Sequence, residues 1–380
     1  MDFKFTSEEQ DIIDMLRDFC LKEVQPIAAE IDEEERFPEE NMKKLGEMGM
    51  MGLPFPEEFG GAGLSYVTYI AACEEFARYC ASTSISFSAH CSLCSWPINE
   101  YGTPEQKAKY LTPLASGEKL GAFALTEPNA GTDAAMQKTT AVDNGDHWLI
   151  NGSKLFITNG GHADFYVIFA MTDKEQGSRG ISSFIIEKDF PGFSRGTKER
   201  KMGIRGSSTY ELIFEDMIVP KENLLGGLNK GFKVAMTTLD GGRIGVAAQA
   251  LGIAEGAIEE CIKYVTQRIQ FGQRISQFQN TQFQLADMHT KVEAARWLIY
   301  RAAQAKQDHE PYTHLAAQAK LFASEVASDV TRRCVQLVGG YGFTREYPFE
   351  RFMRDAKITE IYEGTSEVQK MVISSVMGVK

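Results

Sequence analysis

The run Tyr166-Val-Ile-Phe-Ala-Met171 decides the fold, because it is short, uncharged and rich in β-branched and aromatic residues. Such a run is typical of a buried strand. Similar runs stand at 147–151, 182–187 and 209–214. No helical pattern long enough for a crossover connection separates them, so we expect an antiparallel β domain over residues 120–226.

Dipeptides that end in glycine occur along this domain and predict its turns. Asn-Gly occurs at 144–145, 151–152 and 159–160, Pro191-Gly192 follows the third run, and residues 203–206 are glycine-rich. Asn, Pro and Gly adopt the backbone angles that tight turns require. We therefore expect a turn at each of these places.

Helical periodicity flanks the β domain on both sides. Apolar residues recur every three or four positions before residue 119, and Thr6-Ser7-Glu8-Glu9 resembles a helix N-cap. After residue 227 the pattern predicts four helices, with an uncharged stretch at 244–254 that must be buried on most sides. These helices are expected at 231–268, 281–308, 313–338 and 366–377. The predicted fold class is α+β, with an N-terminal helical domain (1–119), a middle antiparallel β domain (120–226) and a C-terminal four-helix bundle (227–380).

Length and charge exclude several classes of protein. The chain has 380 residues, more than the roughly 250–300 at which a single core stops growing. With 40 basic and 52 acidic residues its formal net charge is −12, which disfavours a general nucleic-acid binder. The acidic N-terminus lacks the features of a signal or transit peptide, so we expect a cytoplasmic protein.

The seven cysteines and one long uncharged segment favour a structural role over a redox, metal or membrane role. The cysteines are odd in number and scattered, which indicates a reducing compartment and no disulfide framework. Cys91 and Cys94 form a lone C-x-x-C without a second pair at metal spacing, so small apolar filler is favoured. Residues 79–99 are uncharged but contain six serines, a histidine and a proline. That polarity favours a helix buried in protein over a membrane span.

The glycine-rich segments and the histidines do not stand in the structural context that a nucleotide-binding or metal-binding motif requires. Gly60–Gly63 lies between helices, and Gly339–Phe343 follows a helix where a Rossmann fingerprint needs a strand. The six histidines form no metal-binding motif, and His309 and His314 do not share a helical face, so solvated residues are favoured and no metal site is expected.

Three subtler groups remain open between a structural and a functional interpretation. Thr126–Asp133 is either a connecting turn, with Gly131 at a tight bend, or a nest of backbone amides for an anionic ligand. Tyr362–Thr365 is either a turn or a catalytic carboxylate beside a glycine. The arginines in apolar or glycine-rich settings are either surface residues or anion ligands. They are Arg243, Arg268 and Arg274.

Taken together, these segments resemble the acyl-CoA dehydrogenase family, most closely its short-chain, butyryl-CoA type. The resemblance runs from end to end through seven ordered blocks. They are AFALTEPNAGTDA (122–134), NGSKLFITNGG (151–161), KMGIRGSST (201–209), TLDGGRIGVAAQALGIAEGA (238–257), QRIQFGQ (267–273), QLVGGYGF (336–343) and MRDAKITEIYEGTSEVQK (353–370). The oxidases that share this fold are usually much longer than this chain.

The resemblance implies FAD bound between the β domain and the C-terminal helices. Where many relatives have Trp-Ile-Thr, this chain has Phe156-Ile157-Thr158. By match of motif, the residues implied to bind FAD within one subunit are Phe123, Leu125, Thr126, Gly131, Thr132, Phe156, Ile157, Thr158, Thr365 and Glu367, together with Ser366. Those implied to reach the FAD of a neighbouring subunit are Arg268, Phe271, Gln279, Gln336, Leu337, Gly339 and Gly340.

The resemblance also implies the chemistry. Glu363 is the implied catalytic base, since the alternative position used by some relatives is a glycine here, Gly242. Glu363 would remove the α-proton while a hydride leaves the β-carbon for FAD, and Gly364 would leave room for the thioester. The acyl-CoA would contact Thr132, Asp240, Arg243 and Gly364.

The expected function is FAD-dependent dehydrogenation of a short-chain acyl-CoA to the trans-2-enoyl-CoA, with electrons passed to an electron-transferring flavoprotein. The resemblance implies a homotetramer, a dimer of dimers, with no nucleic-acid or membrane partner. Three alternatives stay open: another acyl-CoA (cyclic, branched or aryl-propionyl), an enoyl-CoA reductase, or a non-catalytic acyl-CoA-binding protein. In the uncharged segment we expect Ser88, Ala89 and Cys91 to leave a tunnel open for the acyl chain.

Overall fold

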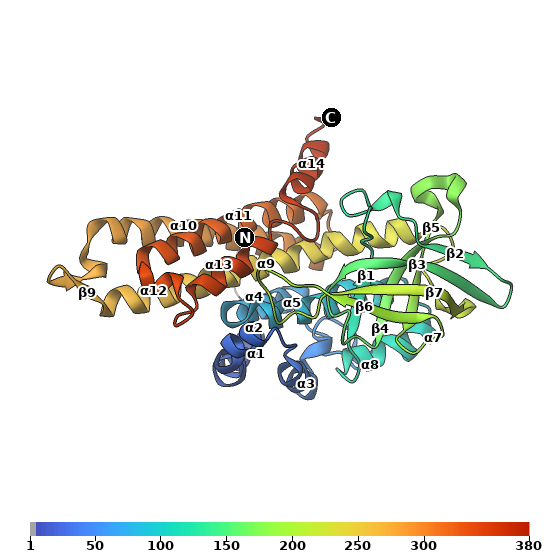
Figure 1. The fold of residues 1–380 in the computed structure, drawn as a ribbon, viewed down its shortest axis with the longest axis horizontal. Coiled ribbons are helices and arrows are strands. Elements are labelled where there is room, and N and C mark those ends of the chain that lie inside the picture. Colours follow the sequence, from blue (N-terminus) through green and yellow to red (C-terminus); the bar gives the residue numbers. More distant parts are fainter. Residues whose placement is uncertain (1–4, 380) are drawn as a thin grey trace.

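The structure is a computed structural model that describes residues 5–379. Figure 1 shows helices first, then a β-sheet at one end of an elongated molecule, then long helices that run away from the sheet. This is the predicted order of elements. Within the described range, no helix has the length and apolar character needed to cross a membrane.

The N-terminal part consists of short helices. Thr6 caps the first one as predicted: its hydroxyl accepts from Glu9 N at 3.2 Å, and the Glu9 carboxylate accepts from Thr6 N at 2.9 Å. The helices are α1 (Ser7–Phe19), η1 (Cys20–Val24), η2 (Gln25–Ile27), α2 (Ala28–Glu34), α3 (Glu39–Glu47), η3 (Met50–Gly52), η4 (Glu57–Phe59), α4 (Tyr66–Tyr79), α5 (Ala81–Ser88), η5 (Ala89–Ser95), α6 (Trp96–Tyr101), α7 (Pro104–Gln106), η6 (Lys107–Leu111) and α8 (Thr112–Ala115).

The uncharged segment 79–99 is helical and buried, which confirms its interpretation. Every residue from 81 to 95 is buried, and three of the six serines, Ser84, Ser92 and Ser95, donate to nearby carbonyl oxygens. Ser84 Oγ donates to Cys73 O at 2.8 Å and Ser92 Oγ to Ser88 O at 2.8 Å. All seven cysteines are free and buried.

The predicted β domain is one sheet with strand order β6-β7-β3-β2-β4-β5-β8, and β1 pairs with β4. All four predicted runs are strands, and the others were not predicted. The strands are β1 (Gly121–Ala124), β2 (Thr140–Asp143), β3 (His147–Ile157), β4 (Phe165–Met171), β5 (Ile181–Glu187), β6 (Phe193–Lys198), β7 (Tyr210–Pro220) and β8 (Leu224–Leu225), with the 3₁₀ turns η7 (Ala134–Met136), η8 (Lys174–Gly180) and η9 (Lys221–Asn223).

Two details of the β prediction are wrong. The sheet is not purely antiparallel, because β1 pairs parallel with β4 and β2 meets β4 through one parallel pair. We expected that only a helix could form the crossover connection between parallel strands. Here the loop after β1 and the β2–β3 hairpin form that connection. The Asn-Gly pair at 151–152 is also no turn: it lies inside β3 at a shift of register. Gly152 has φ 144°, and a Cβ there would lie 2.7 Å from Thr139 Cα.

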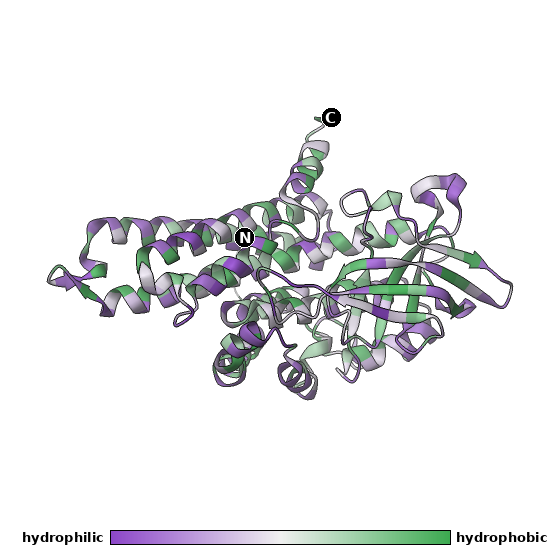
Figure 2. Ribbon diagram, viewed as in Figure 1, coloured by the Kyte–Doolittle hydropathy of each residue, from purple (hydrophilic) through white to green (hydrophobic). Residues whose placement is uncertain are grey.

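The run at 166–171 is buried on both faces, which explains its uninterrupted apolar character. Val167 and Phe169 face the core shared with the helices, while Tyr166 and Ile168 belong to a second core on the other face of the sheet. Figure 2 shows hydrophobic residues concentrated in the central strands and mixed with hydrophilic ones along the long helices.

Three long helices form most of the C-terminal part, and two short helices, α12 and α13, were not predicted. The predicted helix at 366–377 exists as α14; it contacts α11 and its far end projects from the molecule (Figure 1). The short helix α13 packs against both α9 and α11. The elements are α9 (Gly231–Gln267), β9 (Ile269–Gln270), β10 (Gln273–Arg274), η10 (Ile275–Gln277), α10 (Gln279–Gln307), α11 (Thr313–Val338), α12 (Gly340–Phe343), α13 (Phe349–Ile358) and α14 (Ser366–Val376).

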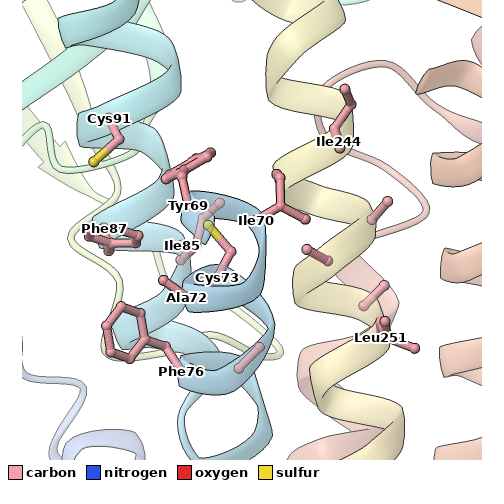
Figure 3. Packing of buried hydrophobic residues seen from close by; sticks show 14 of the residues in the cluster. Tyr69, Ile70, Ala72, Cys73, Phe76, Ile85, Phe87, Cys91, Ile244 and Leu251 are labelled. Atoms are coloured by element: carbon pink, nitrogen blue, oxygen red, sulfur yellow. The ribbon is translucent and has the colours of Figure 1, made fainter. Parts of the chain in front are cut away.

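Helix α9 joins the three parts. Its uncharged stretch at 244–254 is entirely buried, as predicted. Glycines let α9 approach the N-terminal helices closely: a Cβ at Gly252 would lie 2.1 Å from Glu74 O of α4. Figure 3 shows Ile70 of α4 directed into this contact, opposite α9.

One histidine departs from the expected solvated state. His90 is fully buried on η5, where its Nδ1 accepts from Gly121 N at 3.0 Å and its Nε2 donates to Leu114 O at 3.1 Å. Because a peptide N–H can only donate, these bonds require the neutral ring with the proton on Nε2. Burial lowers the His90 pKa to about 4. Within residues 5–379, no group of three His, Cys, Asp or Glu residues is arranged to hold a metal ion.

Candidate active site

The segment Tyr362–Thr365 between α13 and α14 forms a tight, strained loop. Glu363 has φ 56° and Gly364 φ 89°, so two consecutive residues have left-handed backbone angles. A non-glycine residue rarely adopts such angles unless surrounding contacts hold it there.

Three buried side chains hold this loop by its carbonyl oxygens. Lys320 Nζ donates to Gly364 O at 2.7 Å. Gln369 Nε2 donates to the same oxygen at 2.8 Å and to Glu363 O at 3.2 Å. Arg243 Nε approaches Glu363 O at 3.5 Å. The backbone of Glu363 is therefore fixed from α9, α11 and α14 at once.

The Glu363 carboxylate itself lacks a partner. Its Oε2 is buried and makes no hydrogen bond. Burial raises the Glu363 pKa to about 7, against the nearby positive charges of Arg243 and Lys320, which lower it. A carboxylate with a pKa near neutrality and no internal hydrogen bond is suited to take a proton from a ligand.

Gly242 of α9 faces this carboxylate. A Cβ at Gly242 would lie 2.9 Å from Glu363 Oε2 and 2.8 Å from Leu93 Cδ2 of η5. Positions 242 and 363 are the two at which the family resemblance allows a catalytic glutamate, and both face the same space. Because that place holds Glu363, residue 242 has room only for glycine.

Asp240 and Arg243 lie beside this place as an ion pair. Arg243 NH1 bonds Asp240 Oδ1 at 2.6 Å, and Thr313 Oγ1 donates to Asp240 Oδ2 at 2.7 Å. Asp240 remains partly exposed and Arg243 is nearly buried. The structure therefore brings three predicted substrate residues, Asp240, Arg243 and Gly364, together with Glu363.

A cleft of about 310 Å³ lies between the β domain and the Glu363 loop. Phe156 and Thr158 of β3 line one side, and Ile361 and Tyr362 line the other. Phe156 is 59% exposed with φ 59°, at a shift of register in β3. An exposed aromatic ring on a bulge is placed to stack against a flat ligand. Ile157 points into the core of the sheet, so only its backbone is available.

The predicted loop at 125–132 adjoins β3. Leu155 N donates to Thr126 O at 2.8 Å, and the Leu125 side chain is buried, so Leu125 offers its backbone. Phe123 is half-buried against Phe169. Gly131 lies at a bend, as expected, although it has no left-handed angle, and a Cβ there would meet nothing within 4 Å. Thr132, next to it, is exposed.

Thr365 and Glu367 begin the helix that follows Glu363. Thr365 is the N-cap of α14, since its hydroxyl accepts from Val368 N at 3.4 Å, and Glu367 is exposed in the first turn. Both therefore lie next to the catalytic candidate in sequence and in space.

The remaining predicted cofactor residues lie elsewhere. They gather at the far end of the long helices, where Figure 1 shows β9, opposite the end that carries the sheet. Phe271 is 94% exposed there, and Arg268 stacks over the Tyr341 ring at 5.7 Å. Gly339 has φ 74° and open space around it. One chain does not bring this group to Glu363; its members are Arg268, Phe271, Gln279, Gln336, Leu337, Gly339 and Gly340.

Hydrogen bonds link the residue before Glu363 to α9 and α5. Tyr362 Oη donates to Gln249 Oε1, and Gln249 Nε2 donates to Ala81 O at 3.0 Å. Nearer to Glu363, a Cβ at Gly245 would lie 2.6 Å from Ser88 Oγ, so Ser88 faces α9 as expected. Cys91 does not: its Sγ donates to Met51 O at 3.2 Å, away from α9 (Figure 3). The expectation that Cys91 lines a tunnel is wrong.

Sequence reasoning missed Lys320, Gln369 and Gln249. The only signal in the sequence was a lysine or glutamine inside a mostly apolar helical stretch, as in Ala316–Phe322 and Ala247–Ile253. A polar residue in such a stretch must find an internal partner.

Family models match nearly the whole chain. The N-terminal, middle and C-terminal domains of acyl-CoA dehydrogenase match residues 6–118, 122–217 and 229–378. The chain belongs to the acyl-CoA dehydrogenase family. Enzymes of this family are oxidoreductases that act on CH–CH bonds.

Individual relatives of this acyl-CoA dehydrogenase are also similar over their full length. A short-chain specific acyl-CoA dehydrogenase of Clostridium acetobutylicum is 62% identical, with 98% of this chain and 99% of the relative covered. The structure of butyryl-CoA dehydrogenase from Megasphaera elsdenii has TM-score 0.98 at 52% identity, covering 99% and 100% of the two chains. A chain in a structure of the electron transferring flavoprotein of Acidaminococcus fermentans, solved towards a mechanism of flavin-based electron bifurcation, has TM-score 0.98 at 56% identity, covering 99% of both.

Proposed function

We propose that the protein dehydrogenates a short-chain, butyryl-like acyl-CoA to the trans-2-enoyl-CoA with FAD as cofactor. The observation that carries this proposal is the Glu363 carboxylate: its Oε2 is buried and makes no hydrogen bond, its pKa is raised to about 7, and it faces the space left by Gly242. The similarity to short-chain and butyryl-CoA dehydrogenases supports the same substrate class.

The residues of the cleft fit a flavin. Phe156 offers an exposed ring and Thr158 a hydroxyl in the lining of the cleft, and Gly131, on the loop that adjoins β3, offers an unobstructed backbone. Within this chain FAD would be held by residues 123–132 and 156–158 and by the start of α14. When bound, FAD supplies the acceptor for the hydride that leaves the β-carbon.

Glu363 performs the proton transfer. Its carboxylate takes the α-proton, and the electron pair of that C–H bond becomes the new C=C bond as hydride leaves the β-carbon. The products are neutral Glu363, the enoyl thioester and a hydride, which bound FAD would accept. Burial favours the neutral acid over the carboxylate, which makes Glu363 a stronger base than an exposed glutamate.

The wall formed by Tyr362 and Gln249 supports a short acyl chain. Gln249 lies two helical turns beyond Gly242 on α9, roughly 10 Å along the axis. Helical side chains lean toward the N-terminus of their helix, so the Gln249 amide reaches back toward Glu363. Its two hydrogen bonds fix it there. An acyl chain that enters past Glu363 therefore meets a rigid polar wall after a few carbons.

A second copy of the chain completes the proposed cofactor site. The group around Arg268 and Gly339 is exposed and lies far from the cleft of its own chain (Figure 1). Exposed aromatic and apolar side chains surround it: Ile269, Phe271, Phe283, Tyr341 and Phe343. Such a patch on an acidic chain fits an interface between copies, in a dimer of dimers.

The proposed electron acceptor is an electron-transferring flavoprotein, supported by the neighbour in the Acidaminococcus fermentans structure. The proposed location is the cytoplasm, since all seven cysteines are free and buried.

Anaerobic titration with a series of acyl-CoAs, followed by flavin bleaching, tests the proposal. Butyryl-CoA should bleach the wild-type flavin fastest, and Glu363→Gln should retain the flavin but lose at least about 1,000-fold in reduction rate. Near wild-type reduction by Glu363→Gln would remove Glu363 as the base. A preference for cyclic, branched or aryl-propionyl thioesters would replace the substrate class. A colourless protein that takes up no FAD would favour a non-catalytic acyl-CoA binder.

A further inference from the structure

Lys154 on β3 is a lysine with no exposed surface and with every donor used. Its Nζ donates to Glu127 Oε1 at 2.8 Å, to Gln137 Oε1 at 3.0 Å and to Leu125 O at 3.1 Å. A buried ammonium persists only where a charge and hydrogen bonds replace its water. The ordinary position for a lysine on this sheet would be the solvent side, so its burial calls for a structural reason.

Glu127 is the counter-charge and has partners of its own. Its Oε1 also accepts from Thr139 N at 3.1 Å, and its Oε2 accepts from Lys138 N at 2.5 Å. Its backbone pairs with Ala130 in both directions, at 3.2 and 3.1 Å. Lys154 and Glu127 thus tie both ends of the loop 125–139 to one point.

That point adjoins two segments that are proposed to bind FAD. The loop carries Thr126, Gly131 and Thr132, and Lys154 is two residues before Phe156 on the same strand. Leu155 N also donates to Thr126 O at 2.8 Å. The loop 125–132 and the segment of β3 that carries Phe156 are therefore joined through Lys154 and its neighbour.

The sheet does not need this ion pair for its own pairing. The loop 125–139 contains no strand, and β2 begins only at Thr140. Strand β3 pairs with β2 at residues 148–151, and at Lys154 it pairs with Leu212 of β7. The ion pair therefore fixes the path of the loop 125–139, which no strand pairing holds in place.

We propose that Lys154 and Glu127 are positioning residues for FAD: they hold the loop 125–132 in the conformation that binds the cofactor, without touching the reacting atoms. This inference rests on the proposed function, in that FAD is the ligand of the cleft. Its consequence is that loss of the pair weakens flavin binding in a protein that still folds.

The test is a binding titration of deflavinated protein with FAD, followed by flavin fluorescence, on Lys154→Met/Glu127→Gln. The double variant avoids leaving either charge buried alone. We expect the Kd for FAD to rise at least tenfold and the visible spectrum of the bound flavin to shift, while the circular dichroism of the apoprotein matches wild type. Lys154→Arg, which keeps a charge opposite Glu127, should recover part of the affinity.

Asn223→Ala is the matched control. Asn223 is buried in the same domain and donates to Ile185 O and Tyr110 Oη, away from the loop. It should lower the melting temperature of the apoprotein without changing the Kd for FAD. A folded double variant with a Kd within twofold of wild type would overturn the inference.

If the double variant does not fold, the Kd of Gln137→Met for FAD tests the inference instead. It removes one of three acceptors and keeps the ion pair. A Kd raised about threefold supports the inference, and an unchanged Kd overturns it. Failure of the proposed function has a different signature, since wild-type protein would then bind no FAD or resist reduction by butyryl-CoA.

Discussion

Gly242 leaves the space that Glu363 Oε2 occupies: a Cβ at residue 242 would stand 2.9 Å from that oxygen. The distance is shorter than an ordinary contact between a carbon and an oxygen atom. The glutamate side chain and the bare backbone of α9 are therefore complementary, and the shape of the site depends on both residues.

Gly242→Ala should slow flavin reduction by about 10- to 100-fold. The added methyl group meets Glu363 on one side and Leu93 on the other, so the carboxylate must move by a fraction of an ångström. Small misplacements of a catalytic group cost rate of this order. Stopped-flow reduction by butyryl-CoA measures the effect. Flavin content and melting temperature should stay close to wild type, and an unchanged reduction rate would show that Glu363 does not react from this position.

The rate of reduction should rise with pH through about 7. The proposed base Glu363 would act as a carboxylate, and burial raises its pKa to about 7, so the protonated form predominates below that pH. Because Lys320 lowers this pKa, Lys320→Met should move the midpoint of the kcat/KM profile to higher pH.

Lys370→Met is the control for that shift. Lys370 is exposed on α14 and lies 3.8 Å from Glu325. Its removal should leave the midpoint in place. A Lys320→Met profile that coincides with wild type would mean that another group gives the acid limb.

Gln249→Ala should widen the range of acyl chains. The substitution removes the amide that bonds both Tyr362 and Ala81 O, and it opens space at the inner end of the site. We expect hexanoyl- and octanoyl-CoA to gain at least tenfold in kcat/KM relative to butyryl-CoA. Gln176→Ala, at an exposed position in the β domain, should not change the profile. An unaltered preference for butyryl-CoA would place the limit on chain length elsewhere.

The sequence predicted the order of domains because the signals are local. Runs such as 166–171 need both faces buried, and the stretch at 244–254 has no charge to expose, so each identifies its own environment. Glu363 and Gly364 were predicted for the same reason, since a distinctive block surrounds them.

What could not be predicted depends on contacts across long separations. Lys320 bonds a carbonyl 44 positions away, and Gln249 reaches both Ala81 and Tyr362. The parallel pairing of β1 with β4 likewise depends on how the intervening hairpin folds, and a strand carries no mark of its partner's direction. Helix α13 was also not predicted, because its helical pattern extends over only 10 residues.

Mixed subunits should test whether two chains share a cofactor site. Glu363→Gln removes the base of a chain's own cleft, and Arg268→Ala alters the group that is proposed to serve its neighbour. Each variant alone should be impaired. In a hybrid pair one site carries both defects and the other carries none, so co-refolded mixtures should regain up to about half of wild-type activity per hybrid pair. Activity equal to the average of the two single variants would show that each site is complete within one chain.

Acid should destabilise the protein partly through His90. Its pKa is lowered to about 4 in the folded state from an ordinary 6.5, so the unfolded chain takes up a proton that the folded chain resists. The stability that this histidine contributes is fully present above pH 6.5 and is lost as the pH falls toward 4. By linkage, one such group accounts for about 2–3 kcal/mol of unfolding free energy between pH 7 and pH 4.5.

His90→Gln should remove that part of the acid sensitivity. A glutamine can accept from Gly121 N and donate to Leu114 O, as the neutral ring does, but it does not titrate. Urea unfolding at pH 7 and pH 4.5 should therefore show a smaller loss for His90→Gln than for wild type. His309→Gln, at an exposed position, should lose as much stability as wild type. Equal losses in all three proteins would mean that His90 is already protonated in the folded state or is not buried as the structure shows.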